Sequence, residues 1–235
     1  MSTTAQTTSA EPRIPLSKER VLQAAIAVAD QGGIKSLTMR KLAQDLGVEA
    51  MSLYYHVANK DQVLDGVVDV IVAEINAAVS QVIVPAGEGA WKTEMRMRIL
   101  AAREVLLQHP WAPGVIETRT TMSPSIVGYF EALLGVFRSG GFSYDLAHHA
   151  LHALGSRAIG FTQELFNPED GDPDAEASTA MLEQMASQLP NLVGMMSEIS
   201  HDDPDSTLGW CDDQTEFEFG LDLILDGLDR LRATA

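Results

Sequence analysis

The segment between residues 38 and 60 limits the fold of this chain more than any other. Ala43 is small at a point where two helices must approach closely, and Gly47, four residues later, permits a sharp turn. The apolar residues around this turn can close one shared core: Leu42, Leu46, Val48 and Leu53. The spacing predicts two short helices joined by a tight turn, which is the arrangement of a helix-turn-helix motif.

Helical periodicity extends over the rest of the chain, and no segment has the alternation typical of a strand. Ser17 and Asn59 are expected to cap the first and fourth helices, and Gly32 with Gly33 is expected to end the first. Helices are predicted over 17–32, 38–46, 50–56, 59–82, 90–108, 123–139, 144–166, 175–188, 190–199 and 213–232. The sequence therefore predicts an all-α protein.

Charge is divided unevenly along the chain, whose formal net charge is -17. Residues 1–60 carry seven lysines and arginines against five acids, whereas residues 61–235 carry nine against 28. DNA, a polyanion, would be repelled by the second part and tolerated only by the first. The N-terminal quarter is therefore the candidate surface for nucleic acid.

Composition indicates a cytoplasmic protein. Cys211 is the single cysteine, so no disulfide can form within the chain and a reducing compartment is expected. Residues 1–16 lack the apolar run of a secretion signal and are expected to form a disordered tail. No later segment reaches the roughly 18 apolar residues of a membrane span, so no membrane partner is expected.

Polar side chains surround the predicted third helix. With Leu53 directed inward, its neighbours Ser52, Tyr54, Tyr55 and His56 fall largely on the other faces. Hydroxyls and an imidazole suit hydrogen bonds to phosphates and base edges, and Arg40 and Lys60 flank the motif. Spacing alone leaves a second interpretation open, in which this is an ordinary helical hairpin with surface tyrosines.

The amino-acid sequence of this segment resembles that of a known family. Residues 34–65, IKSLTMRKLAQDLGVEAMSLYYHVANKDQVLD, are similar to the DNA-binding domain of the tetracycline-repressor (TetR) family, above all in the runs LTMRKLAQDLGVE and LYYHVANK. A weaker resemblance, to the ligand-binding core of the tetracycline repressors, continues to about residue 166. It includes Arg103, His109 and the run Gly141-Phe142-Ser143.

The resemblance implies roles for residues of the motif. It implies that Arg40 reads a base from the second helix, and that Ala50 and Met51 face bases at the start of the third. Ala50 and Met51 stand where the tetracycline repressors have Gln and Pro, so a different operator is expected. The full DNA-binding set is predicted to be Thr38, Arg40, Ala50, Met51, Ser52, Tyr54, Tyr55, His56 and Lys60.

The resemblance also implies a ligand pocket. Ile116 replaces the metal-binding histidine of the tetracycline repressors, while Asn76, Arg98 and Ala102 replace other drug-contacting residues, which argues against tetracycline as the ligand. The predicted pocket comprises Asn76, Arg98, Ala102, Ile116, His148, Leu151, His152 and Glu164. His148 and His152 are four residues apart, a spacing compatible with two metal ligands, but they are interpreted as polar pocket or interface residues. No metal, cofactor or catalytic residue is assigned.

The expected architecture is a helix-turn-helix DNA-binding domain over 17–65 and a ligand-binding and dimerisation domain over 66–235, joined by the long fourth helix. The helices at 144–166 and 213–232 are expected to form a four-helix bundle in a homodimer. The expected function is repression at a palindromic operator, relieved by an unidentified small-molecule effector, and the protein is not expected to be an enzyme. Two alternatives stay open: a transcriptional activator with the same DNA-binding head, and an all-helical enzyme or small-molecule-binding protein that does not bind DNA.

Overall fold

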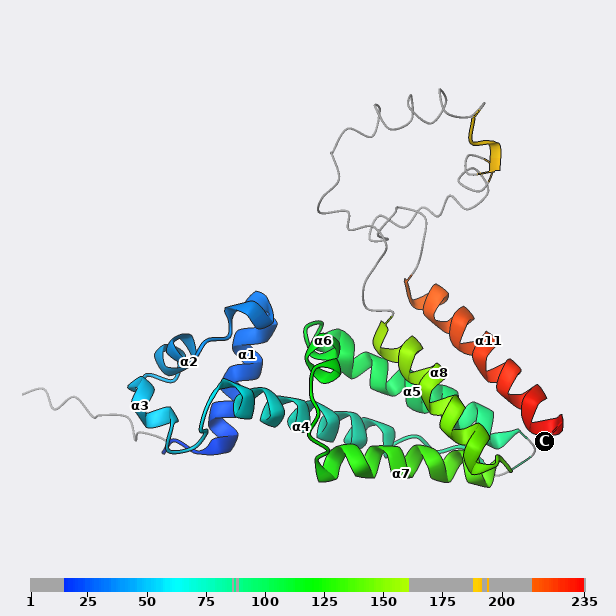
Figure 1. Cartoon of the computed structure of the whole chain (residues 1–235), viewed down its shortest axis with the longest axis horizontal. Coiled ribbons are helices and arrows are strands. Elements are labelled where there is room, and N and C mark those ends of the chain that lie inside the picture. Colours follow the sequence, from blue (N-terminus) through cyan, green and yellow to red (C-terminus); the bar gives the residue numbers. More distant parts are fainter. Residues whose placement is uncertain are drawn as a thin grey trace, which may run out of the picture. The chain divides into compact units, whose positions relative to one another are not determined.

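The computed structural model describes residues 15–85, 87, 89–160, 188–191, 194 and 213–234. Across these residues the regular secondary structure is helical and no strand is present (Figure 1), which confirms the predicted fold class. The chain divides into two compact units. The first runs through Ile71 and takes in Gln108–Thr121, and the second comprises the remaining residues.

The first unit is built from α1, α2, α3, the beginning of α4, and α6. The bounds of these helices are Lys18–Ser36, Met39–Asp45, Ala50–Leu53, Lys60–Val79 and Ala112–Glu117. The core of this unit is formed by apolar side chains from every one of these helices and from the turns between them: Val21, Leu22, Ala25, Ile26, Ala29, Leu37, Leu42, Ala43, Leu53, Val57, Val63, Val67, Ala112 and Val115.

Local sequence signals determine where the helices of the first unit begin. The Ser17 hydroxyl accepts a hydrogen bond from the Arg20 amide at 3.2 Å and so caps α1. Within α1, Gly33 leaves helical geometry with φ at 69°, which breaks the helix where Gly32 and Gly33 predicted its end. The Asn59 side chain accepts from the Gln62 amide at 2.8 Å and caps α4 as expected.

A close helix crossing in the first unit depends on Gly66. A Cβ atom at this position of α4 would lie 2.6 Å from the Leu22 Cδ2 atom of α1, closer than carbon atoms pack. The absence of a side chain at Gly66 therefore allows α1 and α4 to approach each other, and the crossing supports the short helices α2 and α3.

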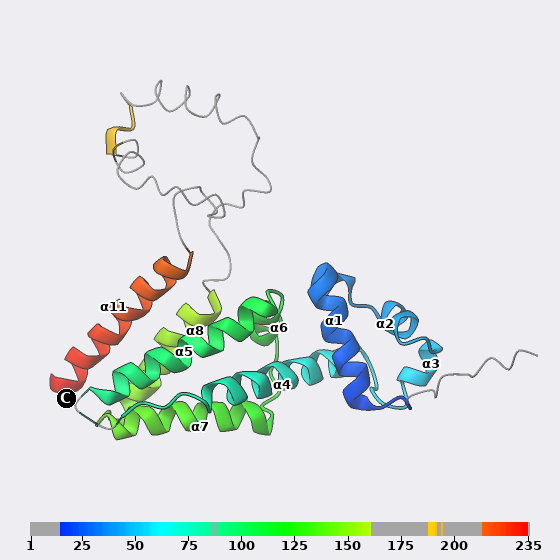
Figure 2. The same ribbon diagram turned by 180° about the vertical axis from the view of Figure 1, so that it is seen from behind.

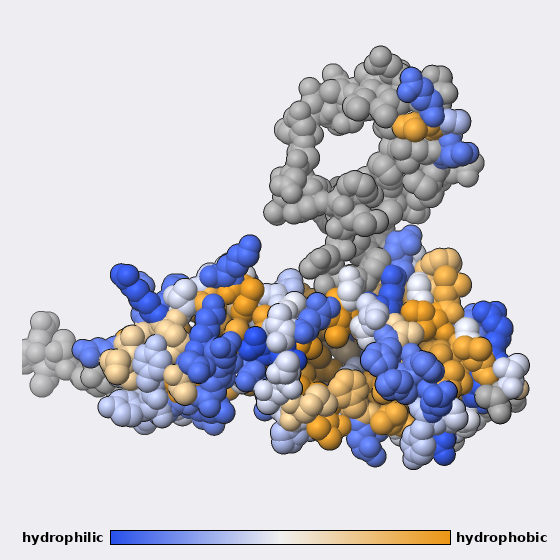
Figure 3. Space-filling model, in the orientation of Figure 1, coloured by the Kyte–Doolittle hydropathy of each residue, from blue (hydrophilic) through white to orange (hydrophobic). Residues whose placement is uncertain are grey.

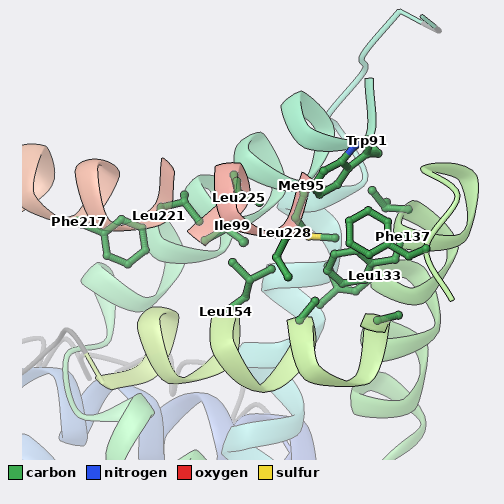
Figure 4. Packing of buried hydrophobic residues seen from close by; sticks show 14 residues of the cluster. Trp91, Met95, Ile99, Leu133, Phe137, Leu154, Phe217, Leu221, Leu225 and Leu228 are labelled. Carbon is green, nitrogen blue, oxygen red and sulfur yellow. The ribbon is translucent and has the colours of Figure 1, made fainter. Parts of the chain in front are cut away.

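The second unit contains the rest of α4 and four further helices. These are α5 (Ala90–Gln108), α7 (Pro124–Ser139), α8 (Tyr144–Gly160) and α11 (Asp213–Thr234). Figures 1 and 2 show α8 lying beside α11, and the two helices are in contact. The core between these helices is drawn in Figure 4: Trp91, Met95, Ile99, Leu133, Val136, Phe137, Phe142, Ala147, Ala150, Leu154, Phe217, Leu221, Leu225 and Leu228.

Ion pairs along one side of this core join α5 to α11. Arg96 lies 2.6 Å from the Glu218 carboxylate and 2.7 Å from that of Asp222, and Lys92 pairs with Asp226. The hydrogen bonds that Arg96 donates to Asp222 and Glu218 raise the pKa of its guanidinium. The acids of α11 are therefore partly neutralised by the cations of α5.

Helix bounds agree with the sequence predictions in most places. The helix predicted over 90–108 is found there, and that predicted from 123 starts at Pro124. The third helix is shorter than predicted, because after Leu53 the chain continues as a turn, and α4 ends at Val79 rather than 82. The predicted helix over 175–188 and the predicted disordered tail lie outside the described residues, apart from 188 and from 15–16, as do most of 190–199 and all of 161–166.

Candidate nucleic-acid interface

The turn between α2 and α3 has the geometry that the Ala43 and Gly47 spacing predicts. Gly47 adopts a φ of 66°, in the left-handed region. The amide of Val48 donates to the Ala43 carbonyl at 3.0 Å, and the amide of Gly47 donates to the Gln44 carbonyl at 3.1 Å. This pair of bonds is a Schellman motif, which satisfies the last carbonyls of α2 and reverses the chain sharply.

The hydroxyl of Thr38 caps α2, accepting from the Lys41 amide at 3.1 Å. Thr38 itself is exposed, so its side chain is accessible to a ligand. A helix N-terminus presents unpaired amides and a partial positive charge, both of which favour an anion such as a phosphate. One residue therefore both starts α2 and borders the candidate interface.

The predicted DNA-binding residues gather on the outside of the first unit. Met51 is 69% exposed, Tyr54 44% and Tyr55 89%, although hydrophobic side chains of this size are usually covered in a stable fold. Arg40, Ala50 and Lys60 are also exposed, while Ser52 and His56 are half-buried. The α2–α3 turn thus presents aromatic, apolar, hydroxyl and cationic groups from one small region of the chain.

Two cations of this region are available to an anionic ligand. Lys41 is held by Asp45 at 2.7 Å in an i,i+4 ion pair, whereas within the described part of the chain Arg40 and Lys60 have no carboxylate partner. Glu19 carries negative charge nearby: its pKa is lowered by hydrogen bonds from its own backbone and Ser17, and slightly by Lys18 and His56. Arg40 and Lys60 are therefore the strongest candidates for phosphate and base contacts.

A segment distant in sequence completes the first unit. The Asp30 carboxylate of α1 accepts a hydrogen bond from the Trp111 indole at 2.7 Å, and the same oxygen lies 2.8 Å from the His109 Nδ1 atom. At the other end of α6, Arg119 lies 3.5 Å from Asp61 and 3.4 Å from Asp65, both on α4. We refer to these contacts of residues 108–121 as the α6 clasp, and no sequence signal predicted it.

The predicted pocket residues fall into different environments. In the second unit, the Asn76 amide donates to the Ser125 carbonyl at 3.0 Å, Ala102 is buried, and Leu151 is half-buried. Ile116 belongs to α6 in the first unit, and Glu164 lies outside the described residues. Their assignment to a pocket stays a prediction.

Two pocket residues predicted from the sequence lie at the surface of the single chain. His148 and His152 are exposed on α8, opposite the side that Ala147, Ala150 and Leu154 bury. A side chain on the outer face of a helix cannot line a cavity inside its own unit, because the helix backbone lies between them. The other described residues of the chain do not enclose these histidines.

Sequence reasoning missed two polar neighbours of Arg98. The Glu94 carboxylate lies 2.7 Å from the Arg98 guanidinium within α5, and the i,i+4 spacing of these residues could have suggested the pair. Burial raises the pKa of the Tyr129 phenol, and the positive charge of Arg98 opposes this in part. Tyr129 comes from α7, so only the tertiary structure relates it to Arg98.

The described residues contain neither a metal site of three or more ligands nor a membrane span. Among them, no group of three or more histidine, cysteine, aspartate or glutamate side chains is arranged to hold a metal ion. Within the same residues, every helix is too short or too polar to cross a bilayer.

Comparison with known proteins agrees with the geometry of both units. Residues 21–67 match the family model of bacterial regulatory proteins of the tetR family, and residues 85–232 match that of the tetracyclin repressor-like C-terminal domain. The HTH-type transcriptional repressor DrrR1 of Streptomyces coeruleorubidus is 30% identical over 230 residues, which cover 94% of this chain and 80% of that protein.

Further relatives include the tetracycline repressor of class A from transposon 1721 of Escherichia coli. It is 29% identical, and the match covers 92% of each chain. The solved structure of ActR from Streptomyces coelicolor in complex with actinorhodin has a TM-score of 0.66 and 26% identity, over 92% of this chain and 97% of ActR. With a helix-turn-helix head and a helical C-terminal unit that both match, the chain belongs to the tetR family of bacterial regulatory proteins and is a ligand-responsive, DNA-binding transcriptional regulator.

Proposed function

We propose that this protein represses transcription by holding a palindromic operator with two copies of the α2–α3 motif, and that a small organic effector releases it. The observation that carries this proposal is the exposed group of Arg40, Met51, Tyr54, Tyr55 and Lys60 around a Schellman turn. In this arrangement α3 enters the major groove, Arg40 and Met51 meet base edges, and Tyr54 and Lys60 contact phosphates.

The proposed dimer forms through α8 and α11. Phe219, Leu223 and Leu231 of α11 are 63%, 55% and 55% exposed and are spaced by four and eight residues, so they share one face of the helix. Figure 3 shows hydrophobic side chains, in orange, along α11 on the visible face. An exposed apolar stripe of this kind is typical of an interface, and a four-helix bundle made by two copies would cover it.

The proposed effector site lies in the second unit around Asn76, Arg98 and Tyr129. These polar groups border an otherwise apolar core, which is typical of a site that binds and orients an organic ligand. ActR, a relative of this chain, has been solved with the organic ligand actinorhodin. The replacements at Ala102 and Ile116 argue that the effector of this protein is not tetracycline.

Release of DNA requires the effector to favour one state of the protein over the other. A ligand that binds both states equally shifts nothing, and weakening operator binding about 10³-fold requires about 4 kcal/mol of coupling. In this proposal α4 carries the coupling, because one continuous helix contributes residues to both units. Repression, rather than activation, is proposed because DrrR1 and the class A tetracycline repressor are repressors.

The direct test is binding of the full chain to DNA from beside its own gene, measured by fluorescence anisotropy. Arg40→Ala and Tyr54→Ala are each expected to weaken binding by about tenfold or more, since a good base or phosphate contact contributes about 1–3 kcal/mol. Lys41→Ala is the matched control: it removes the neighbouring cation, which Asp45 already holds. Its effect is expected to stay below about threefold.

Two outcomes of this binding test would contradict the proposal. Equal binding by wild type, Arg40→Ala and Tyr54→Ala would show that the interface is assigned to the wrong surface. Absence of binding to any DNA in dilute buffer would favour the alternative of a helical protein that does not bind DNA. We further propose that the protein is cytoplasmic and has no catalytic activity of its own, since regulators of this family act through DNA binding.

A further inference from the structure

Two histidines on the outer face of α8 have a geometry that the regulator function leaves unexplained. His148 and His152 are one helical turn apart, and their ring centroids are 4.7 Å from each other with the planes 79° apart. Both side chains are exposed. Within the described residues each makes ring contacts with neighbouring histidines but no hydrogen bond or ion pair. Their ring nitrogens are therefore available to a ligand.

The separation of the rings fits coordination to one metal ion. With metal–nitrogen distances of about 2.0–2.1 Å and ligand angles of about 90–110°, two imidazoles bound to the same ion have centroids roughly 4.5–5.2 Å apart. The observed 4.7 Å falls inside this interval. The i,i+4 spacing places both rings on the same face of α8, so the two side chains can approach one ion together.

We propose that His148 and His152 form a two-histidine site for a divalent transition metal ion such as Zn²⁺, Ni²⁺ or Cu²⁺. Neutral imidazole is a preferred ligand of these ions, whereas Mg²⁺ and Ca²⁺ prefer oxygen. The proposal stands on one chain alone, so it does not depend on the dimer arrangement proposed above. The remaining coordination positions are filled by water or by donors of the second copy.

Charge around the site favours a cation. The chain has a formal net charge of -17, and the Asp145 carboxylate, three residues before His148, lies 4.0 Å from the His149 ring. A negative surface raises the local concentration of divalent cations. His149 itself is directed elsewhere, with its ring 5.7 Å from that of His148, and it is not included in the site.

The test is isothermal titration of the full chain, without an affinity tag, with Zn²⁺ and Ni²⁺ at pH 7.5. Wild type is expected to bind one ion per chain, or one ion per two chains if two copies share it. Either stoichiometry supports the site, provided that binding depends on His148 and His152. His148→Ala and His152→Ala are each expected to weaken binding by about tenfold or more, since even residues that only support ligands contribute that much. His149→Ala is the matched control, with the affinity expected to stay within about twofold.

Cu²⁺ electron paramagnetic resonance gives a second reading. Hyperfine splitting from two imidazole nitrogens per chain is expected in wild type and His149→Ala, and from one in His152→Ala. The proposal is overturned if His148→Ala and His152→Ala bind as tightly as wild type, if His149→Ala loses as much affinity as they do, or if wild type binds no ion.

Discussion

Individual residues of the first unit contribute through backbone conformation as well as through side-chain chemistry. Gly47 holds a φ of 66°, and a Cβ atom there would meet no heavy atom within 4 Å. The requirement for glycine is therefore conformational and not steric. Lys60, at the first position of α4, contributes instead through a charge that no described carboxylate neutralises.

Gly47→Ala is expected to lower the free energy of unfolding by about 1–2 kcal/mol, because an alanine in the left-handed region is strained. Gly128→Ala is the matched control, since Gly128 is exposed in the middle of α7 with open space around it. That substitution is expected to raise the stability by about 0.5–1 kcal/mol. Urea denaturation of both variants measures the two effects, and a loss at Gly128 as large as that at Gly47 would contradict the conformational explanation.

Lys60→Ala is expected to weaken operator binding and to reduce the slope of log K against log salt by about one, because one phosphate contact is lost. Lys35, an exposed lysine in the last turn of α1, is the control, and its replacement by alanine is expected to leave the slope unchanged. Anisotropy titrations at four salt concentrations measure both slopes. An unchanged slope for Lys60→Ala would remove this residue from the interface.

At the scale of elements, helices distant in sequence are joined by polar contacts. The α6 clasp attaches residues 108–121 to α1 and α4 through Asp30 and Arg119. In the second unit, α5 and α11 are joined by the ion pairs of Lys92 and Arg96. The Trp111 and His109 side chains of the clasp are buried, whereas the ion pairs between α5 and α11 are half-exposed, so these two sets of contacts are expected to differ in energy.

Asp30→Ala is expected to lower the free energy of unfolding by about 1–3 kcal/mol, because it leaves the Trp111 indole and the His109 ring without their shared acceptor. Asp45→Ala removes a carboxylate from an exposed pair with Lys41 and is expected to cost less than about 0.5 kcal/mol. Hydrogen exchange of the α6 amides is expected to quicken only in Asp30→Ala. Equal exchange rates in both variants would show that the clasp does not hold α6.

Glu218→Gln is expected to destabilise the protein at pH 7 by less than about 1 kcal/mol, since the pair with Arg96 is half-exposed. Hydrogen bonds from Gln214 and then Arg96 lower the pKa of Glu218 below its ordinary value of 4.5. A depressed carboxyl pKa contributes stability above the unfolded value that is lost as pH falls through the folded value. The difference in Tm from wild type should therefore shrink below about pH 4.5.

The exposed Glu131 of α7 provides the control for this measurement. Glu131 has no ion pair among the described contacts, so Glu131→Gln is expected to leave Tm close to the wild-type value between pH 3.5 and 7. If the Tm difference between Glu218→Gln and wild type is constant across this pH range, the charge of the Glu218 carboxylate is not its source.

At the scale of the whole molecule, DNA binding depends on two copies of the chain. One helix-turn-helix contacts few phosphates, and specific sites usually join two half-sites about one helical turn, roughly 34 Å, apart. In each chain the first unit carries the helix-turn-helix and the second carries the proposed effector site. α4 contributes residues to both units. Loss of the dimer should therefore weaken DNA binding even though every DNA-contacting residue is intact.

Leu223→Glu is expected to convert the dimer to a monomer at micromolar concentration and to weaken operator binding by at least tenfold, because it places a charge within the apolar stripe of α11. Met97→Glu is the matched control: Met97 is also an exposed hydrophobic residue, at 42%, but it lies on α5. Sedimentation velocity measures the assembly state. A dimer that survives Leu223→Glu would move the interface elsewhere.

Local sequence signals were sufficient to predict most helix starts and turns of the first unit. Ser17, Gly33, Gly47 and Asn59 predicted helix starts and turns that the structure contains, because caps and left-handed glycines act through neighbouring backbone atoms. Helical periodicity likewise predicted α5 at its observed bounds. The candidate DNA-binding residues lie within 23 consecutive positions, 38–60; the polar ones around Leu53 followed from the local pattern, whereas Ala50 and Met51 were implied by the family resemblance.

The sequence by itself therefore determined the helical class, the turn at Gly47 and the cationic, aromatic head. Tertiary structure decided the rest: that α6 belongs to the first unit, that Tyr129 lies near Arg98, and that His148 and His152 face outward. The physical reason is the range of the interactions involved. Caps and glycine turns act over three to five residues, whereas the clasp joins side chains 79 and 81 positions apart, and such contacts depend on how whole helices pack.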